Sequence, residues 1–145
     1  MATLKKNNAV SKPSRLPSVD FEGREQTALM NWLRVRYQEA YGLTYHVPNG
    51  GRRDKVTGAK LKAQGVKAGV PDLVLAQARG GYFGLYIEFK ATPPHDASVS
   101  KEQREWVRIL LAQGYCAVVC KGMNEAMKEI TSYMSMPLTT QRVAG

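Results

Sequence analysis

The chain has 145 residues, of which 43% are hydrophobic and 23% are charged, and its formal net charge is +9. This size and composition predict one globular domain with a core that needs no disulfide or metal to hold it together. No apolar run reaches the roughly 18 residues that span a bilayer and no secretory signal is visible, so we expect an intracellular, cytoplasmic protein with no membrane partner.

Residues 1–19 carry positive charge without any acidic residue, together with two prolines and several serines. The basic residues of this segment are Lys5, Lys6, Lys12 and Arg15. The composition predicts a disordered basic arm, although a passive tail explains it equally well. The overall excess of positive charge says little about the fold, but it favours a polyanionic partner.

Residues 20–41 show the spacing of one buried helix face. That face consists of Ala28, Leu29, Trp32 and Leu33. Asp20 is the expected N-cap, and Gly42 is the expected end of the helix. A short strand is predicted over residues 43–47, and the turn residues at 48–51 end it.

Residues 52–65 are polar and basic, and they predict a loop with a short helix at 59–64. The only acid is Asp54, whereas the basic residues here and just beyond are Arg52, Arg53, Lys55, Lys60, Lys62 and Lys67. Such side chains contact phosphates without reading base sequence, so this loop is the candidate DNA contact. A solvated loop that keeps the chain in solution is the structural alternative.

Two apolar runs at residues 72–77 and 82–91 flank a glycine turn and predict a β-hairpin. A loop at 92–99 leads to a helix over 100–113, a buried strand over 115–120 and a last helix over 124–134. This order predicts an α/β fold with a mixed sheet covered on both faces by helices. The folded domain is expected at 20–136 and a tail at 137–145. Cys116 and Cys120 would lie about 13 Å apart on one strand, too far for a disulfide.

The ends of the two hairpin runs carry the candidate chemistry. Alternate residues of a strand share a face, so Glu88 and Lys90 project together while Phe89 points into the core. Asp72 opens the partner run, and two neighbouring carboxylates suit Mg²⁺, with the Phe89 main-chain carbonyl as a candidate third ligand. Lys90 can orient a metal-bound water and stabilise charge on an attacked phosphate. The alternative is an exposed Glu88–Lys90 ion pair of little energetic value.

Three further polar residues have both a catalytic and a structural explanation. Gln103 stands three residues after Ser100, as in a capping box, yet it can also contact the nucleophilic water or a phosphate. Glu22 and Glu25 complement the dipole of the first helix, or one of them reaches the metal site. The lone histidines have no partner spacing, and we assign neither a catalytic role.

Four motifs together resemble the VRR-NUC domain, the virus-type replication-repair nuclease branch of the PD-(D/E)xK superfamily. They are Asn49-Gly50-Gly51-Arg52, Leu61-Lys62-Ala63-x-Gly65-Val66-x-Ala68-Gly69-Val70-Pro71-Asp72-Leu73, Ile87-Glu88-Phe89-Lys90 and Ser100-x-x-Gln103. The resemblance spans about residues 22–133 and implies a restriction-endonuclease-like core with Mg²⁺- or Mn²⁺-dependent phosphodiester cleavage. The catalytic set that it implies is Glu22, Asp72, Glu88, Lys90 and Gln103, with Glu25 as the rival of Glu22. The expected DNA contacts are Asn49, Arg52, Arg53, Lys60, Lys62 and Lys67.

Small stand-alone members of this family are similar to phage-type, homodimeric Holliday-junction resolvases. The resemblance therefore implies a homodimeric, structure-selective DNA endonuclease without a nucleotide cofactor, encoded by a phage or its bacterial host. Two alternatives remain open. One keeps the chemistry but acts on flaps, nicks or plain duplex, and the other is a DNA-binding module without catalysis, for which the carboxylate pair has no use.

Overall fold

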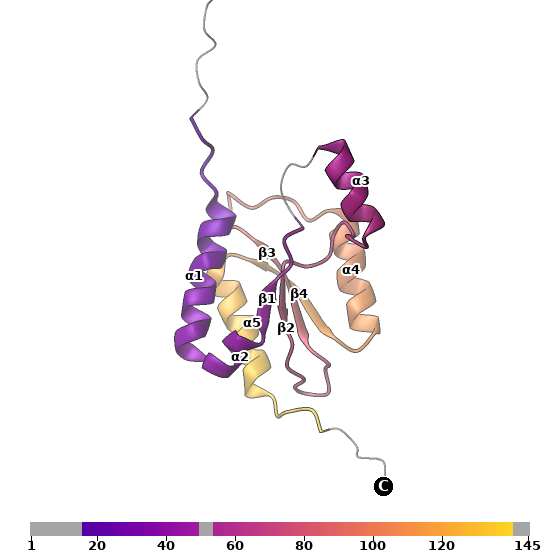
Figure 1. The fold of residues 1–145 in the computed structure, drawn as a ribbon. Coiled ribbons are helices and arrows are strands. Elements are labelled where there is room, and N and C mark those ends of the chain that lie inside the picture. Colours follow the sequence, from indigo (N-terminus) through magenta and orange to yellow (C-terminus); the bar gives the residue numbers. More distant parts are fainter. Residues whose placement is uncertain (1–15, 50–53, 141–145) are drawn as a thin grey trace, which may run out of the picture.

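The computed structural model describes residues 16–49 and 54–140, which form an α/β fold with a mixed β-sheet flanked by helices (Figure 1). The elements are α1 (Phe21–Arg36), α2 (Gln38–Gly42), β1 (Thr44–His46), α3 (Lys55–Ala63), β2 (Leu73–Leu75), β3 (Leu85–Lys90), α4 (Lys101–Ala112), β4 (Cys116–Lys121) and α5 (Met123–Ser135). The sheet order is β1-β2-β3-β4. The β1–β2 and β2–β3 pairs are antiparallel, while β3 and β4 are parallel. The predicted mixed sheet is thereby confirmed.

The sheet separates two layers of helices. In Figure 1, α1, α2 and α5 lie on one side of it, and α4 lies on the other side with α3 above. Leu85, Ile87 and Phe89 of β3 belong to the core that the sheet shares with α1 and α5. The alternate residues Glu88 and Lys90 therefore face the α4 side.

The predicted hairpin is present, with shorter strands than the sequence suggested. Leu73 lies opposite Ile87, and Leu75 lies opposite Leu85. Asp72 immediately precedes β2 and is the last residue before regular pairing begins. The hairpin therefore brings the start of one strand beside the end of the other, where Glu88 and Lys90 stand.

The single helix predicted over residues 20–41 is wrong in two respects. The chain leaves the helix at Tyr37 (φ −140°, ψ 76°), so two helices form. The Tyr37 ring packs edge-on against Trp32 with centroids 5.9 Å apart, and the new direction of α2 buries Ala40 completely. Ala28 is exposed, so Leu29 and Leu33 are the residues that α1 buries.

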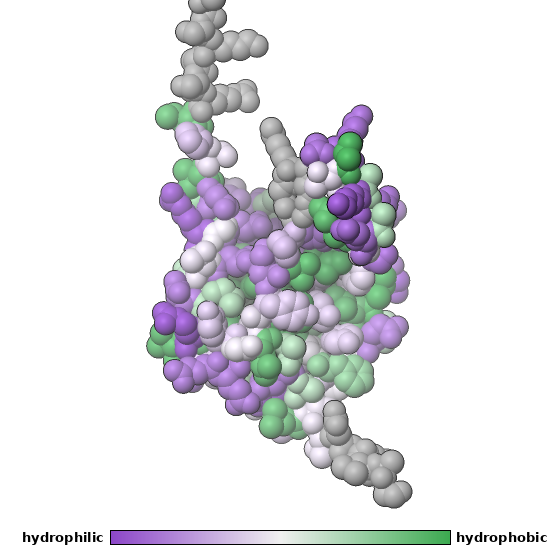
Figure 2. All heavy atoms as spheres, in the orientation of Figure 1, coloured by the Kyte–Doolittle hydropathy of each residue, from purple (hydrophilic) through white to green (hydrophobic). Residues whose placement is uncertain are grey.

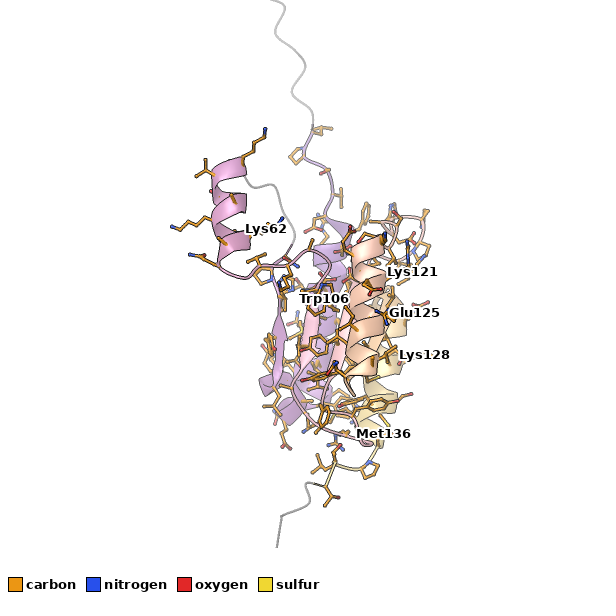
Figure 3. All side chains as sticks on the ribbon, turned by 90° about the vertical axis from the view of Figure 1, so that its right-hand side faces the viewer. Lys62, Trp106, Lys121, Glu125, Lys128 and Met136 are labelled. Carbon is orange, nitrogen blue, oxygen red and sulfur yellow. The ribbon has the colours of Figure 1, made fainter. Side chains whose placement is uncertain are left out.

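The helix predicted at 59–64 begins earlier, at Lys55. Asp54 caps it by accepting hydrogen bonds from the main chain and the hydroxyl of Thr57, at 2.7 and 2.9 Å. No residue of α3 is buried, and the helix stands away from the body in Figures 1 and 3. The turn residues 50 and 51 and the predicted contacts Arg52 and Arg53 lie outside the described residues.

The chain beyond α5 stays attached to the connection between β2 and β3. Thr139 donates from its main chain to Ala78 and from its hydroxyl to Tyr82, and Leu138 bridges to Arg79. The expected arm at 1–19 is described only from residue 16, and the tail only to residue 140. Both cysteines are free thiols, as expected. Within the described ranges, no helix is long and apolar enough to cross a membrane.

Candidate active site

Asp72 is held at the hairpin by a main-chain contact. Its Oδ2 accepts a hydrogen bond of 2.9 Å from the N–H of Phe89. The Phe89 side chain is completely buried in the core, so this main-chain donor is fixed in place. The Asp72 carboxylate consequently lies beside Glu88, which precedes Phe89 on the strand.

Glu88 is a buried carboxyl with one satisfied oxygen and one unsatisfied oxygen. The residue is 1% exposed. Oε1 accepts a hydrogen bond of 2.6 Å from Nε2 of Gln103 and lies 3.4 Å from Nζ of Lys90. Oε2 is buried without a hydrogen-bond partner in the described part of the chain. An unpaired carboxylate oxygen at this depth is costly, so the arrangement favours either a proton or a cation there.

The pKa values of the two carboxyls reflect burial and proximity. Burial first, and then the negative charge of Asp72, raise the pKa of Glu88 to about 7, against the opposing effect of Lys90. Burial also raises the pKa of Asp72, although the Phe89 N–H and the Lys90 ammonium lower it in part. In the absence of metal, burial and the charge of Asp72 therefore favour the protonated form of Glu88 near neutral pH.

Lys90 is buried as well, at 5% exposure. The exposed surface ion pair considered as the alternative is thus excluded by the burial of both Glu88 and Lys90. The Lys90 ammonium faces Glu88 from the same side of β3. A buried ammonium between carboxyls and the protein edge is suited to meeting a phosphate oxygen.

Gln103 forms the predicted helix cap and also contacts Glu88 of the site. Ser100 and Gln103 form a complete capping box at the start of α4, as predicted. The amide oxygen serves the cap, whereas the amide nitrogen donates to Glu88. The helix start thereby orients the buried carboxyl.

The loop before Asp72 packs closely against the start of α4. A Cβ on Gly69 would lie 2.5 Å from the main-chain carbon of Glu102 and 2.8 Å from the nitrogen of Gln103. On the same loop, Ala68 accepts a hydrogen bond of 3.1 Å from the indole of Trp106, which extends from α4 in Figure 3. This close approach joins the Asp72 side of the site to the Gln103 side.

The structure separates the two acids of α1. Burial first, and then the charge of Asp72, raise the pKa of Glu22, while Lys90 lowers it. These effects require that the Glu22 carboxyl lie near both residues. Glu25 instead accepts hydrogen bonds from the main chain and the hydroxyl of Thr92. Glu22 is therefore the acid that lies near Asp72 and Lys90, and Glu25 anchors the loop after β3.

His46 was assigned no role, yet it contacts the site. Its Nδ1 lies 2.9 Å from the main-chain oxygen of Asp72 and 3.1 Å from the amide of Gln26. Since a carbonyl oxygen only accepts, Nδ1 carries the hydrogen of that contact. His46 also lowers the pKa of Asp72 electrostatically. No spacing in the sequence links residues 26, 46 and 72, so only the folded structure reveals this contact.

The predicted DNA contacts that the structure describes lie on and beside α3. Lys60 and Lys62 are exposed on the helix, and Lys62 and Lys67 line a hollow of about 520 Å³ with Asn49. Asn49 is itself engaged inside the protein, because its amide donates to the main-chain oxygen of Lys67. Hydrophilic side chains cover much of α1 and α3 in Figure 2. Of the predicted DNA contacts, Lys62 and Lys67 thus line one hollow, and Asn49 holds the main chain of Lys67 there.

The donor set suits a hard divalent cation. No three His, Cys, Asp or Glu side chains gather into a ready-made metal cluster within residues 16–49 and 54–140. The site nevertheless offers two neighbouring carboxyls and the unpaired Oε2 of Glu88. Carboxylate oxygens are the ligands that Mg²⁺ and Mn²⁺ accept with several waters, so the residues present fit such an ion.

Comparisons with known proteins place the chain beside one family of domains. A family model described as "VRR-NUC domain" matches residues 21–124. A solved structure named "VRR_NUC domain protein" is 34% identical to this chain, with a TM-score of 0.71. The likeness covers 84% of this chain and 93% of that one. Among curated proteins, no sequence matches.

Proposed function

The chain belongs to the VRR-NUC domain family of nucleases and has its restriction-endonuclease-like α/β fold, and from this premise we propose that it is a metal-dependent, structure-selective DNA endonuclease. The observation that carries the proposal is the buried Asp72–Glu88 pair with an unpaired oxygen beside Lys90. A module that only bound DNA would gain nothing from carboxylates facing phosphates. A four-way junction is the substrate that we propose first.

Asp72 and Glu88 would hold a Mg²⁺ or Mn²⁺ ion, with the main-chain carbonyl of Phe89 as a third ligand. When bound, such an ion supplies an acidified water and neutralises charge on the scissile phosphate. Gln103 keeps Oε1 of Glu88 occupied, which leaves Oε2 for the ion. The Phe89 N–H and the contact of His46 with Asp72 hold the second carboxylate in place.

The remaining residues act on the reacting groups. Hydrolysis forms a bond between water oxygen and phosphorus and breaks the bond to one ester oxygen. Lys90 would donate hydrogen bonds to the attacking water or to a phosphate oxygen, where negative charge increases in the transition state. Glu22, near Asp72 and Lys90, would orient the attacking water. Lys62 and Lys67 would fix the backbone of the duplex.

A panel of labelled DNA substrates tests the proposal directly. Junction, flap, nicked and linear duplex DNA are incubated with Mg²⁺, with Mn²⁺ and with EDTA. We expect cleavage only with a divalent ion, fastest on junctions, and a loss of about 10³-fold or more for Lys90→Ala. Lys121→Ala is the matched control, since Lys121 lies opposite Lys90 in the sheet but is paired with Asp96. Cleavage that survives Lys90→Ala, or no cleavage of any substrate, would refute the proposal.

A homodimer is the second part of the proposal. A two-fold axis would place two active sites against two strands of a junction. Sedimentation of the free protein and of its junction complex measures the assembly. A strict monomer that prefers flaps or nicks would favour the alternative substrate class while leaving the chemistry intact.

A further inference from the structure

A row of aromatic side chains crosses the sheet on the face that carries the active site. Tyr45 of β1 lies opposite Val74 of β2, and Val74 lies opposite Tyr86 of β3. Residues opposite each other in a sheet share a face, and Glu88 follows Tyr86 by two residues on the same strand. The row therefore begins about 6.6 Å along β3 from the buried carboxyl, at roughly 3.3 Å per residue.

The row continues through ring contacts towards the turn of the hairpin. Tyr86 meets Tyr115 edge-on with centroids 5.3 Å apart, and Tyr115 meets Phe83 at 5.7 Å. We call Tyr45, Tyr86, Tyr115 and Phe83 the aromatic row. Burial, followed by the neighbouring Tyr45 and Tyr115, raises the pKa of the Tyr86 hydroxyl, which places Tyr45 beside Tyr86.

The aromatic row is open to solvent at both ends. Tyr45 is 53% exposed and Phe83 is 61% exposed. On this face α4 packs over β4 and the adjoining part of β3. Figure 3 looks onto this face and shows α4 on one side, with β1 uncovered on the other side below α3.

We propose that the aromatic row is a stacking site for unpaired nucleobases, which holds a strand that has left the duplex beside the active site. This inference rests on the proposed function. It adds that the enzyme selects its substrate by the unpaired bases of branched DNA. Every base offers a π-face to an aromatic ring, and such stacking is independent of base sequence. A base inside a regular duplex is already stacked, so only junctions, flaps and other branched DNA present one.

Three observations favour nucleic acid as the occupant. The row adjoins Glu88 and Lys90 on the same face, so a second protein copy seated there would separate the site from its substrate. Three of the four rings are tyrosines, which combine an apolar ring with a polar hydroxyl suited to a hydrated nucleic-acid surface. The chain also carries a net charge of +9, and Lys62 and Lys67 line a hollow near α3, where the backbone can be held.

The test measures binding in EDTA, where no cleavage occurs. The probes are a single-stranded 15-mer, a flap with 2-aminopurine in its unpaired arm, and a plain duplex. Tyr45→Leu removes the ring but keeps apolar area, and Tyr45→Phe keeps the ring. The matched control is Tyr41→Leu, an exposed tyrosine of α2 on the opposite side of the sheet.

We expect Tyr45→Leu to weaken binding of the single strand and the flap by about 5- to 100-fold and to leave duplex binding unchanged. Tyr45→Phe and Tyr41→Leu should bind like the wild type. The 2-aminopurine fluorescence should be quenched by the wild type and recover with Tyr45→Leu. Phe83→Leu provides a second variant at the other exposed end, with a smaller loss of the same selectivity.

Three results would overturn the proposal. These are an equal loss on duplex and flap, no loss on either, or a change from dimer to monomer in Tyr45→Leu, which would make this face an interface between copies. Mg²⁺-dependent cleavage by the wild type is assayed separately. A protein that stacks bases without cutting DNA refutes only the proposed function, and one that cuts without this selectivity refutes only the stacking site.

Discussion

In the unfolded chain, the Glu88 carboxyl has its ordinary pKa of 4.5. In the metal-free folded protein, the same carboxyl keeps its proton to higher pH. Because burial and Asp72 raise the folded pKa to about 7, the folded state binds more protons between these two values. The resulting contribution to stability is complete below pH 4.5 and is lost as the pH rises through 7. We expect the free energy of unfolding in EDTA to fall by up to roughly 3 kcal/mol between pH 4.5 and 8 from this group.

Denaturant unfolding in EDTA at several pH values measures this loss. Glu88→Gln should flatten the profile, because the amide cannot ionise, whereas Glu39→Gln on the exposed start of α2 should not. Mg²⁺ should stabilise the wild type more at pH 8 than at pH 5, since the ion replaces the proton. A wild-type profile that does not change on Glu88→Gln would show that this carboxyl is not the titrating group.

His46 contacts the main chain of Asp72, and we expect it to position this proposed metal ligand. Its contact with the Asp72 main-chain oxygen is one of two, since the N–H of Val47 also donates there at 2.8 Å. Removing an outer partner of a metal ligand typically costs metal affinity without unfolding the site. We expect His46→Ala to weaken Mn²⁺ binding about 10-fold, as measured by calorimetry, with little change in melting temperature. His46→Gln, which keeps a donor, should recover part of the loss, and equal effects of both variants would contradict the role.

At the scale of elements, Gly69 joins the Asp72 loop to α4. Its φ of +86° is strained for any other residue, and a Cβ would meet the main chain of Glu102 and Gln103. Gly65 has a similar φ of +104° but nothing within 4 Å of its Cβ position. Gly65→Ala therefore isolates the backbone strain, expected at about 1–2 kcal/mol, and Gly69→Ala should cost about 2–5 kcal/mol in unfolding free energy.

Activity separates these two glycine variants further. Gly69→Ala should displace the loop from Gln103 and lower cleavage well beyond its effect on stability, when both variants are assayed below their melting temperatures. Gly65→Ala should retain nearly normal cleavage. If both variants lose activity equally, the close approach of the loop to α4 is not what assembles the site.

The elements that sequence patterns predicted are those whose signals are local. Alternation and the glycine turn defined the hairpin, and Ser100 with Gln103 defined the helix start. The break at Tyr37 has no proline or glycine to announce it, because the cause is tertiary: the Tyr37 ring on Trp32 and the burial of Ala40. Glu22 and Glu25 stand one helical turn apart, so spacing alone could not distinguish them. His46 lies 26 residues from its contact and carries no pattern at all.

For the whole molecule, exposed basic residues of the described ranges lie on both sides of the sheet. Lys60, Lys62 and Lys67 lie on or beside α3, near the side that carries Glu88 and Lys90. Arg34 of α1 and Lys128 of α5 are exposed on the other side. Uniformly distributed charge would attract DNA to either side, whereas a functional surface requires that only one side make phosphate contacts.

The salt dependence of DNA binding distinguishes attraction by charge on either side from phosphate contacts on one side only. Each phosphate contact adds about 0.9 to the slope of log affinity against log salt for duplex DNA. Lys62→Ala with Lys67→Ala should lower that slope by about 2 and weaken duplex and branched DNA equally, since phosphate contacts carry no structural or sequence preference. The charge-matched control, Arg34→Ala with Lys128→Ala, should leave the slope unchanged. Equal changes from both double variants would mean that DNA is held by net charge alone rather than by the hollow beside α3.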